Sequence, residues 1–501
     1  MSTAPVTGTP GAEADDHNLP DLATISDRRV AGTAVADLAA RVATLGLGMV
    51  TVALLTRHLG VEGFASFNYA LAWGLLFAPL IDFGLSQAAI NRLSVRDVSP
   101  SQIAGSLLAM RLAMSLLFGG LAAVLAVATA PNRTVAIGSL VVCLGMVLST
   151  PASLIAVVRT AMKPIWIIIG NASNAIIWAA MAVVLIVADA GVVPFVIAST
   201  AAGLASSLIA LLMARRLTPI ARPTREALMA LLRLSLPLGI AAIAMAVYYR
   251  INSILLYQIS GADEAGHLAA AQRLLDQVQI IPIAIIGAVF PLISEAAVNN
   301  PARLRRFVIA AWEILLGFGL PIVALGMAVA HPLSRLLFGA EFEGPTGTVL
   351  MIVWPVVIAI FIGYLGGALV PALNLVRIWM AVAFAGAILN VALNLALIPP
   401  FQARGAAVAT LGTEFPIMVV MLWIALRRAD LRLPVGRVAR MALAAAAAGG
   451  AAAVVAPHSL IGALAAGAAL YLALLPLLRI VDLRALLDAV RNPKAAVDAL
   501  G

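Results

Sequence analysis

The sequence predicts an all-α polytopic membrane protein of about fourteen transmembrane helices, and three observations lead to this prediction. Of its 501 residues, 63% are hydrophobic and only 11% are charged, which is less than half of the charged share of an ordinary soluble domain. Apolar runs of about 20 residues, the length that crosses a bilayer as a helix, recur along the whole chain. The third observation is that the basic residues are concentrated in alternate predicted loops, as in helical membrane proteins.

The apolar segments are about twice as long as the strands of a transmembrane barrel, so helices are expected. The expected spans are 30–56, 66–90, 102–129, 134–157, 164–187, 192–214, 234–259, 266–293, 307–330, 346–371, 376–398, 405–426, 437–456 and 460–479. The longest outer loop, near 331–345, is short. We therefore expect no extramembrane domain that could hold a catalytic site of its own.

The basic residues predict the orientation of these spans. With a cytoplasmic N-terminus, 24 of the 32 Lys and Arg residues lie in inner segments. The outer segments contain only Arg57, Arg133, Arg335 and Arg404. The spans themselves contain Arg41, Arg111, Arg250 and Arg273. This distribution predicts a multi-pass protein of the cytoplasmic (inner) membrane with both termini in the cytoplasm, and it accounts for the net charge of +9 without a nucleic-acid partner.

Two similarities within the chain predict an internal repeat. Gly63 in LLTRHLGVEGFASFNYALAW aligns with Gly266 in LLYQISGADEAGHLAAAQRLL, and Gly191 aligns with Gly405. Both copies start on the same side of the membrane, so they are parallel repeats. The predicted parts are a disordered cytoplasmic tail (1–27), an N-terminal six-helix lobe (28–216), a basic cytoplasmic linker (217–233), a C-terminal six-helix lobe (234–428), an extra helix pair (429–480) and a cytoplasmic tail (481–501).

Ionisable residues inside the spans are the first candidates for a functional site. Each costs about 2.5–3.5 kcal/mol at mid-membrane, so we expect them to face protein or a wet cavity. In span 1, Asp37 and Arg41 stand one turn apart; they form either a pair that joins helices or a polar wall of a central cavity. In span 7, Tyr249 accompanies Arg250, which has no acidic residue within a turn. Arg250 is the best candidate for an anion ligand, unless a distant acid or backbone carbonyls satisfy it.

Span 8 contributes five polar groups within eight residues, namely Gln272, Arg273, Asp276, Gln277 and Gln279. This face is too polar for lipid and is predicted to line the cavity, although Arg273 and Asp276 can also simply pair. Asp82 near the inner end of span 2 is expected to make a helix contact at the cytoplasmic end, and Arg111 and Glu313 are each expected to neutralise a neighbour.

Spans 11 and 12 supply a different set of polar groups. Asn390 and Asn394 share a face of span 11, and Thr410 and Glu414 lie on span 12. Their oxygen atoms suit a hard cation such as Na⁺. The other interpretation is hydrogen bonding between helices.

The sequence contains no motif of covalent or metal catalysis. HExxH, GxSxG, a Walker-type loop and Cys/His clusters are absent, and Cys143 is a single thiol within an apolar run. The chain is therefore predicted not to be an enzyme and to need no cofactor or catalytic metal.

Three stretches resemble the polysaccharide biosynthesis flippases, the O-antigen and exopolysaccharide family of the multidrug/oligosaccharidyl-lipid/polysaccharide exporter (MOP) superfamily. They are RHLGVEGFASFNYALAWGLLFAPLIDFGLSQAAINRL, GADEAGHLAAAQRLLDQVQIIPIAIIGAVFPLISE and LNVALNLALIPPFQARGAAVATLGTE. The likeness covers about residues 28–428. His267 departs from it, because many relatives have an aromatic residue there.

The resemblance implies two six-helix lobes forming a V around a cavity lined by spans 1, 2, 7 and 8. It further implies alternating access for a polyprenyl-pyrophosphate-linked oligosaccharide destined for cell-surface polysaccharide. Arg41, Arg250 and Arg273 match the family's cavity arginines by span only. Coupling to Na⁺ or H⁺ is a further possibility, and the implied partners are the bilayer, the polysaccharide polymerase and the glycosyltransferase machinery.

Three other functions stay open at this point. The first is a lipid II flippase, which is a near relative of the polysaccharide biosynthesis flippases. A cation-coupled drug exporter of the same superfamily is disfavoured by fourteen spans and by cavity arginines. A membrane glycosyltransferase or polymerase would need a large outer loop with catalytic acids.

Overall fold

The computed structural model describes residues 27–95, 99–161 and 164–480. Within these ranges, the side chains at 27–42, 95, 164–165, 237–238, 240–250 and 299 lie outside the description. Residues from Thr44 onward form one compact unit, and the packing described below is within it.

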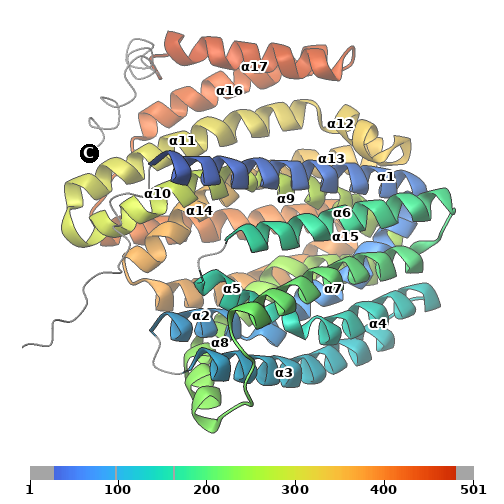
Figure 1. Ribbon diagram of the computed structural model, residues 1–501. Coiled ribbons are helices and arrows are strands. Elements are labelled where there is room, and N and C mark those ends of the chain that lie inside the picture. The colour runs from blue at the N-terminus through green and yellow to red at the C-terminus, as the bar shows by residue number, and fades with distance from the viewer. Residues whose placement is uncertain (1–26, 96–98, 162–163, 481–501) are drawn as a thin grey trace, which may run out of the picture. The chain divides into compact units, whose positions relative to one another are not determined.

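Every element in the described part of the chain is a helix (Figure 1). The first half contains α1 (Asp27–Asp82), α2 (Leu85–Val95), α3 (Pro100–Ala128), α4 (Arg133–Leu148), η2 (Thr150–Leu154), α5 (Ile155–Thr160), α6 (Pro164–Val187) and α7 (Val192–Leu217). The second contains α8 (Arg225–Ser260), α9 (Ala262–Val278), α10 (Ile280–Asn299), α11 (Pro301–Ala328), α12 (Ala330–Phe338), η3 (Ala340–Phe342), α13 (Glu343–Val353), α14 (Val356–Ala372) and α15 (Val376–Arg428). The chain continues with α16 (Val435–Val455) and α17 (Leu460–Leu477).

Ten helices in the described residues are long and apolar enough to cross a membrane, or eleven if the bent pair Arg133–Leu148 and Thr150–Thr160 is one span. Two of the ten, Ala43–Ser94 and Val376–Arg428, have 52 and 53 residues, more than twice what one crossing needs. The first breaks at Gly60 and the second at Gln402, both in a left-handed backbone conformation. Each broken helix thus provides two arms of spanning length, while the total of fourteen spans stays a prediction.

Side-chain caps explain why several helices begin directly after short connections. Asn132 accepts a hydrogen bond from the backbone N–H of Val135 at the start of α4. Asn300, Thr224 and Ser459 cap α11, α8 and α17 in the same way. Such caps satisfy amide groups that would otherwise lack partners at the helix end.

The helix pair α16–α17 packs on α11, and Figure 1 shows the three side by side. Gly449 lets α16 approach closely, since a Cβ there would lie 3.0 Å from the backbone oxygen of Ala324. Tyr471 donates a hydrogen bond of 2.8 Å to the backbone oxygen of Gly317. Glu313 pairs with Arg437 at 2.6 Å, so the expectation that Glu313 neutralises a neighbour is confirmed. Arg111 likewise pairs with Asp82.

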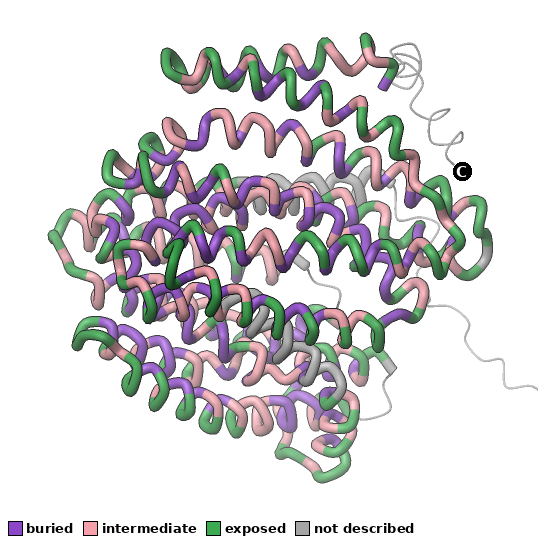
Figure 2. The backbone as a smooth tube through the Cα atoms, turned by 180° about the vertical axis from the view of Figure 1, so that it is seen from behind, coloured by how far each residue is buried: buried purple, intermediate pink, exposed green. Residues whose placement is uncertain are grey.

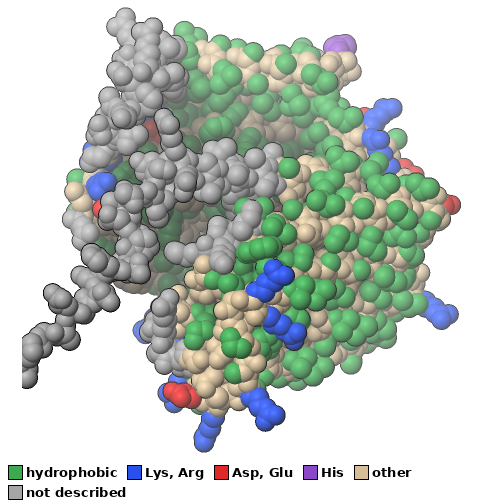
Figure 3. All heavy atoms as spheres, viewed as in Figure 1, with side chains coloured by type: hydrophobic (Ala, Val, Ile, Leu, Met, Phe, Trp, Pro, Cys, Tyr) green, Lys and Arg blue, Asp and Glu red, His purple; other side chains and the backbone are tan. Residues whose placement is uncertain are grey.

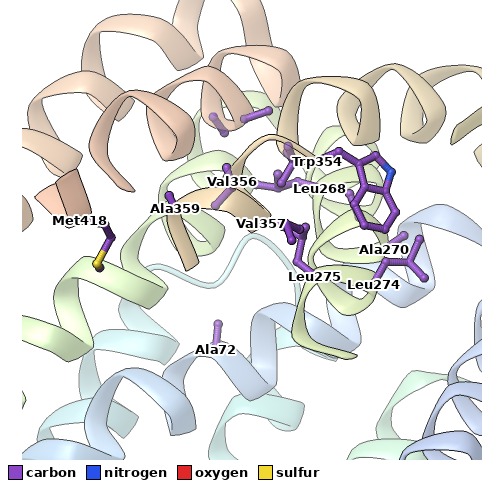
Figure 4. Packing of buried hydrophobic residues seen from close by; sticks show 14 of the residues in the cluster. Ala72, Leu268, Ala270, Leu274, Leu275, Trp354, Val356, Val357, Ala359 and Met418 are labelled. Atoms are coloured by element: carbon purple, nitrogen blue, oxygen red, sulfur yellow. The ribbon is translucent and has the colours of Figure 1, made fainter. Parts of the chain in front are cut away.

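The core consists of apolar side chains from helices distant in sequence. Figure 4 shows Leu268, Leu274 and Leu275 of α9 near Trp354 and Val357 of the α13–α14 region. Leu268 is 1% exposed and Val357 is fully buried. Apolar packing therefore fixes α9, the helix that carries the predicted polar face.

The outer surface is apolar as well. Leu117, Val124, Val184 and Ile461 are between 63% and 80% exposed. Figure 2 shows exposed and buried residues alternating along the helices, and in Figure 3 hydrophobic side chains dominate the visible face, with only a few Lys and Arg side chains among them and at its margins. Exposed apolar area on this scale indicates a surface that contacts lipid.

Candidate functional site

The main cavity has a volume of about 890 Å³. Its lining extends from Asn252, in the last turns of α8, and Gln272 of α9 to Pro371 at the end of α14 and Trp379 in the first turns of α15. Its polar lining comes from Asn252, Gln272, Asp276, Gln279, Tyr364, Asn390, Thr410 and Glu414. The sequence had singled out six of these, namely Gln272, Asp276, Gln279, Asn390, Thr410 and Glu414.

One wall of the cavity is a polar stripe that follows α9 to its end. Gln272, Asp276 and Gln279 are spaced by four and three residues, so they share one helix face. The amide of Gln279 donates to Asp276 Oδ1 at 3.3 Å, and Tyr364 donates to Gln279 Oε1 at 3.3 Å. Ser253 of α8 donates to Gln272 Oε1 at 3.3 Å. These bonds leave a row of amide and carboxylate groups along the cavity wall.

A second group of polar lining residues comes from α8 and from both arms of α15. Asn252 donates to Thr410 Oγ1 at 3.4 Å, and Thr410 in turn donates to the backbone oxygen of Ala406 at 2.9 Å. Asn390 donates to Thr413 Oγ1 at 3.4 Å across the break in α15. Glu414 is only 7% exposed and faces the same cavity. A carboxylate so nearly buried adds the largest charge in this wall.

Asn394 lies one turn from Asn390 and is fully buried behind this wall. Its amide nitrogen donates to the backbone oxygen and to Oδ1 of Asn390, at 2.8 and 3.0 Å. Its own Oδ1 has no hydrogen-bond partner among the described residues. A buried oxygen without a donor is costly unless something else satisfies it.

The N-terminal half contributes differently to the cavity. Its described lining residues are Leu75, Ala78 and Pro79 of α1, all of them apolar. Pro79 lies inside the helix, one turn before the end of α1. In the described part of the chain, the polar lining of the cavity thus comes from residues 252–414.

The other residues that the sequence predicts for the cavity are not among its described lining residues. The side chains of Asp37, Arg41, Tyr249 and Arg250 lie outside the described residues. Arg273 does not line the cavity; its guanidinium donates to Asn68 Oδ1 of α1 at 2.8 Å. Helical geometry explains the difference, because Arg273 is rotated by about 100° from Gln272.

At the other end from Pro371, the two halves touch. The seam, as we call it below, consists of residues 57–69 of α1 against 257–273 and 336–346. At Gly266 the two backbones approach closely, since a Cβ there would lie 2.5 Å from the backbone oxygen of Val61. Any larger residue at 266 would therefore push the halves apart.

Aromatic rings fill the rest of the seam. Tyr69 and Tyr257 have ring centroids 4.4 Å apart, and Phe64 meets Phe342 at 6.4 Å. His267 is 3% exposed, packs edge-on against Phe342 and shares a hydrogen bond of 2.9 Å with Thr346. The histidine therefore occupies an aromatic position within the packing of the seam.

Sequence reasoning did not single out Asn252 or Tyr364 as cavity residues. Asn252 offered a signal, because an amide in an apolar span is rarely without a polar neighbour. Tyr364 offered none, since a single tyrosine is common in such helices. Gln277, by contrast, belongs to the predicted polar face but is absent from the cavity lining, because it is rotated by about 100° from Asp276.

The polar groups of the cavity wall suit the binding of a polar or charged ligand. The carboxylates of Asp276 and Glu414 with nearby amide and hydroxyl oxygens can hold a hard cation or hydrogen bond to a hydroxyl-rich ligand. The cavity volume exceeds that of a single ion by far and leaves room for part of a larger solute.

Comparison with known proteins gives one family and several structures of similar fold. The family described as "Polysaccharide biosynthesis protein" matches residues 32–297. No curated protein sequence matches the chain. Among solved structures, the lipid II flippase MurJ in an inward closed conformation is similar with a TM-score of 0.75 at 12% identity, covering 88% of this chain and 98% of that one.

Two further structures share the fold. An inward-facing multidrug resistance MATE family transporter of the MOP superfamily has a TM-score of 0.63 at 16% identity, covering 77% of this chain and 94% of that one. A MOP superfamily transporter from Pyrococcus furiosus has a TM-score of 0.56 at 14% identity, covering 79% and 95%. At these identities the likeness shows a common fold, that of MOP-superfamily transporters.

Proposed function

The chain belongs to the polysaccharide biosynthesis protein family, and from this premise we propose that it flips a polyprenyl-pyrophosphate-linked oligosaccharide from the cytoplasmic to the outer leaflet. Transport proceeds by alternating access and serves cell-surface polysaccharide biosynthesis. The protein works in the cytoplasmic membrane with both termini in the cytoplasm. Glycosyltransferases supply its substrate and a polymerase consumes its product.

The observation that carries this proposal is a polar cavity bordered by both halves, which contact each other at the seam and again in the first half of α8, where a Cβ at Gly239 would lie 2.6 Å from the Phe83 ring. The cavity reaches Pro371 and Trp379, whereas Gly266 and Val61 are in direct contact at the other end. A carrier that exposes its site to one side at a time needs contacts between its halves that open and close in turn. Hydroxyl-rich sugars match the amide and carboxylate groups of the wall, while the polyprenyl chain can stay in lipid.

Arginines are the groups that would meet the pyrophosphate. They bind phosphate oxygens in a bidentate manner, which lysines cannot do. Arg41 and Arg250 are assigned to this role from the sequence. Arg273 joins them when the halves separate, because its bond to Asn68 crosses the seam.

The same cavity wall supports cation coupling. Asn252, Asn390, Thr410 and Glu414 gather oxygen atoms in one buried cluster, with Asn394 behind them. The Oδ1 atom of Asn394, which lacks a donor among the described residues, is suited to join the ligand shell of Na⁺ after a small rotation. A proton on Glu414 is the alternative coupling species.

A proteoliposome assay with a defined polyprenyl-pyrophosphate oligosaccharide tests the proposal. Two negative charges gain roughly 4–5 kcal/mol per 100 mV if they cross the whole field, so an imposed potential should accelerate export. Lipid II and a cationic drug are the matched comparison substrates. Preference for lipid II would reassign the substrate class, and exchange of the drug against Na⁺ without lipid transport would make the protein a drug exporter.

A further inference from the structure

A second cavity, of about 840 Å³, lies beside the seam and apart from the main one. We call it the seam groove. It is lined by Arg57 of α1, by His331, Arg335 and Leu336 of α12, and by Ser459 and Ile461 next to the turn between α16 and α17. Three segments distant in sequence therefore form one site beside the seam.

Two guanidinium groups line the seam groove. Arg57 donates to the backbone oxygen of Leu336, which places its charge beside Arg335. Glu343 pairs with Arg335 at 3.3 Å, but the Arg335 side chain is 65% exposed, and such pairs hold their partner weakly. Two cations against one carboxylate leave the groove positive. These are two of only four arginines that the sequence places in outer segments.

The other side of the groove is apolar and faces outward. Ile461 is 80% exposed and Leu336 is 55% exposed, and α16 and α17 are both apolar enough to cross a membrane. A ligand that fits must combine an anionic group with hydrocarbon. Inorganic phosphate would leave the apolar side uncovered, and a fatty chain without charge would leave the arginines unused.

We propose that the seam groove binds an anionic glycerophospholipid in preference to a zwitterionic one, with the phosphodiester between Arg57 and Arg335 and the acyl chains against α16 and α17. Arginine matches phosphate oxygens in charge and geometry. Ser459, whose hydroxyl caps α17, lies at the rim where the headgroup emerges.

The site is complete only when the seam is closed. Arg57 comes from the N-terminal half and Arg335 from the C-terminal half, and a Cβ at Gly339 would lie 3.6 Å from Cγ of Arg57. A ligand that binds one conformation more tightly shifts the population toward it. The bound phospholipid therefore holds the seam closed and keeps the main cavity directed to the other side.

The full chain in nanodiscs of phosphatidylcholine, with or without phosphatidylglycerol, tests the proposal without a transport assay. Lipid retained by the protein is identified by native mass spectrometry. Spin labels at positions 131 and 344, which are exposed, report the width of the seam after Cys143 is replaced by Ala. Wild-type protein should retain phosphatidylglycerol selectively, and this lipid should narrow the distance distribution.

Variants of opposite expected sign make the test specific. Arg335→Ala should weaken selective retention about tenfold, the effect of one charge-assisted hydrogen bond, whereas Glu343→Gln should strengthen it. Arg404→Ala, an exposed arginine away from the groove, is the control and should change nothing. The proposal would be overturned if the wild type retained both lipids equally, or if Arg335→Ala retained phosphatidylglycerol as selectively as the wild type. It would also be overturned if Arg404→Ala lost as much selective retention as Arg335→Ala. Displacement of the phospholipid by a polyprenyl pyrophosphate would also overturn it, because the groove would then belong to the substrate.

Discussion

The two halves of the molecule contribute very different walls to the same cavity. The described N-terminal half offers Leu75, Ala78 and Pro79. The C-terminal half offers two carboxylates, four amides, a hydroxyl and a tyrosine. Sequence repeats predict a common architecture for the halves, so the contrast concerns chemistry and not fold.

This contrast assigns tasks to the halves. The polar wall of the C-terminal half can bind a cation or sugar hydroxyls. Because α8 and α9 contribute residues to both the polar wall and the seam, ligand binding at the wall can affect the seam. The apolar wall provides a surface along which the halves can slide without breaking hydrogen bonds. Substitutions in the two walls should therefore differ strongly in effect.

The largest difference in lipid transport is expected between the variants Arg250→Ala and Arg41→Ala. Arg250→Ala should lower lipid transport at least about tenfold, because a guanidinium that binds pyrophosphate contributes more than one charge-assisted bond. Arg41→Ala should cost less, since the sequence places Asp37 one turn away, where it can neutralise that charge. Transport rates in proteoliposomes, normalised to folded protein, measure both.

Arg250→Lys serves as the matched control and should recover only part of the activity, because lysine acts as a point charge. Wild-type rates for Arg250→Ala would remove this residue from the substrate path.

Glu414→Gln is expected to have the next largest effect. It removes the charge from the nearly buried wall while keeping shape and hydrogen-bonding capacity, so any Na⁺ or pH dependence of transport should disappear. Glu295→Gln, at a carboxylate that is 60% exposed, is the control. If transport shows no ion dependence in the wild type either, Asn390, Asn394 and Glu414 serve packing alone.

Asn252→Ala should have an intermediate effect. Its amide is 3% exposed and its described partner in the wall is Thr410, at 3.4 Å. Loss of one such bond should raise the Na⁺ concentration for half-maximal transport roughly fivefold to tenfold. Unchanged Na⁺ dependence would place Asn252 outside the cation site and weaken the contrast between the walls.

The sequence predicted much of the polar wall because helical spacing is a strong constraint. Gln272 and Asp276 stand one turn apart on α9, and Asn390 and Asn394 stand one turn apart on α15, so the period of the helix alone puts each pair on one face. The all-helical membrane fold followed in the same way from the length of the apolar segments.

The rest depended on how helices rotate against each other, which spacing does not determine. Arg273 is adjacent to Gln272 yet points to Asn68 across the seam. The direct contact of Gly266 with Val61 could not be predicted either, because glycine at the start of a helix has several uses. The seam groove joins α1, α12 and the α16–α17 turn, which no local pattern connects.

The smallest effect is expected in the apolar wall. Leu75→Gln adds a polar group to a surface that is already 43% exposed, and transport should stay within about twofold of the wild type. The same assay measures it. If Leu75→Gln lowered the transport rate as much as Arg250→Ala, the apolar wall would also bind substrate directly. The assignment of ligand binding to the C-terminal half alone would then be wrong.

Transport by a protein whose seam is locked covalently tests the central claim most directly. Cysteines at 62 and 341, both exposed and on opposite sides of the seam near Gly60, can be joined by a short, cleavable bifunctional maleimide in a Cys143→Ala background. Alternating access predicts that cross-linking abolishes flipping of the lipid-linked oligosaccharide and that cleavage of the linker restores it, while each single cysteine labelled alone has little effect. Undiminished flipping by fully cross-linked protein would contradict the account, because the substrate would then cross without separation of the two halves.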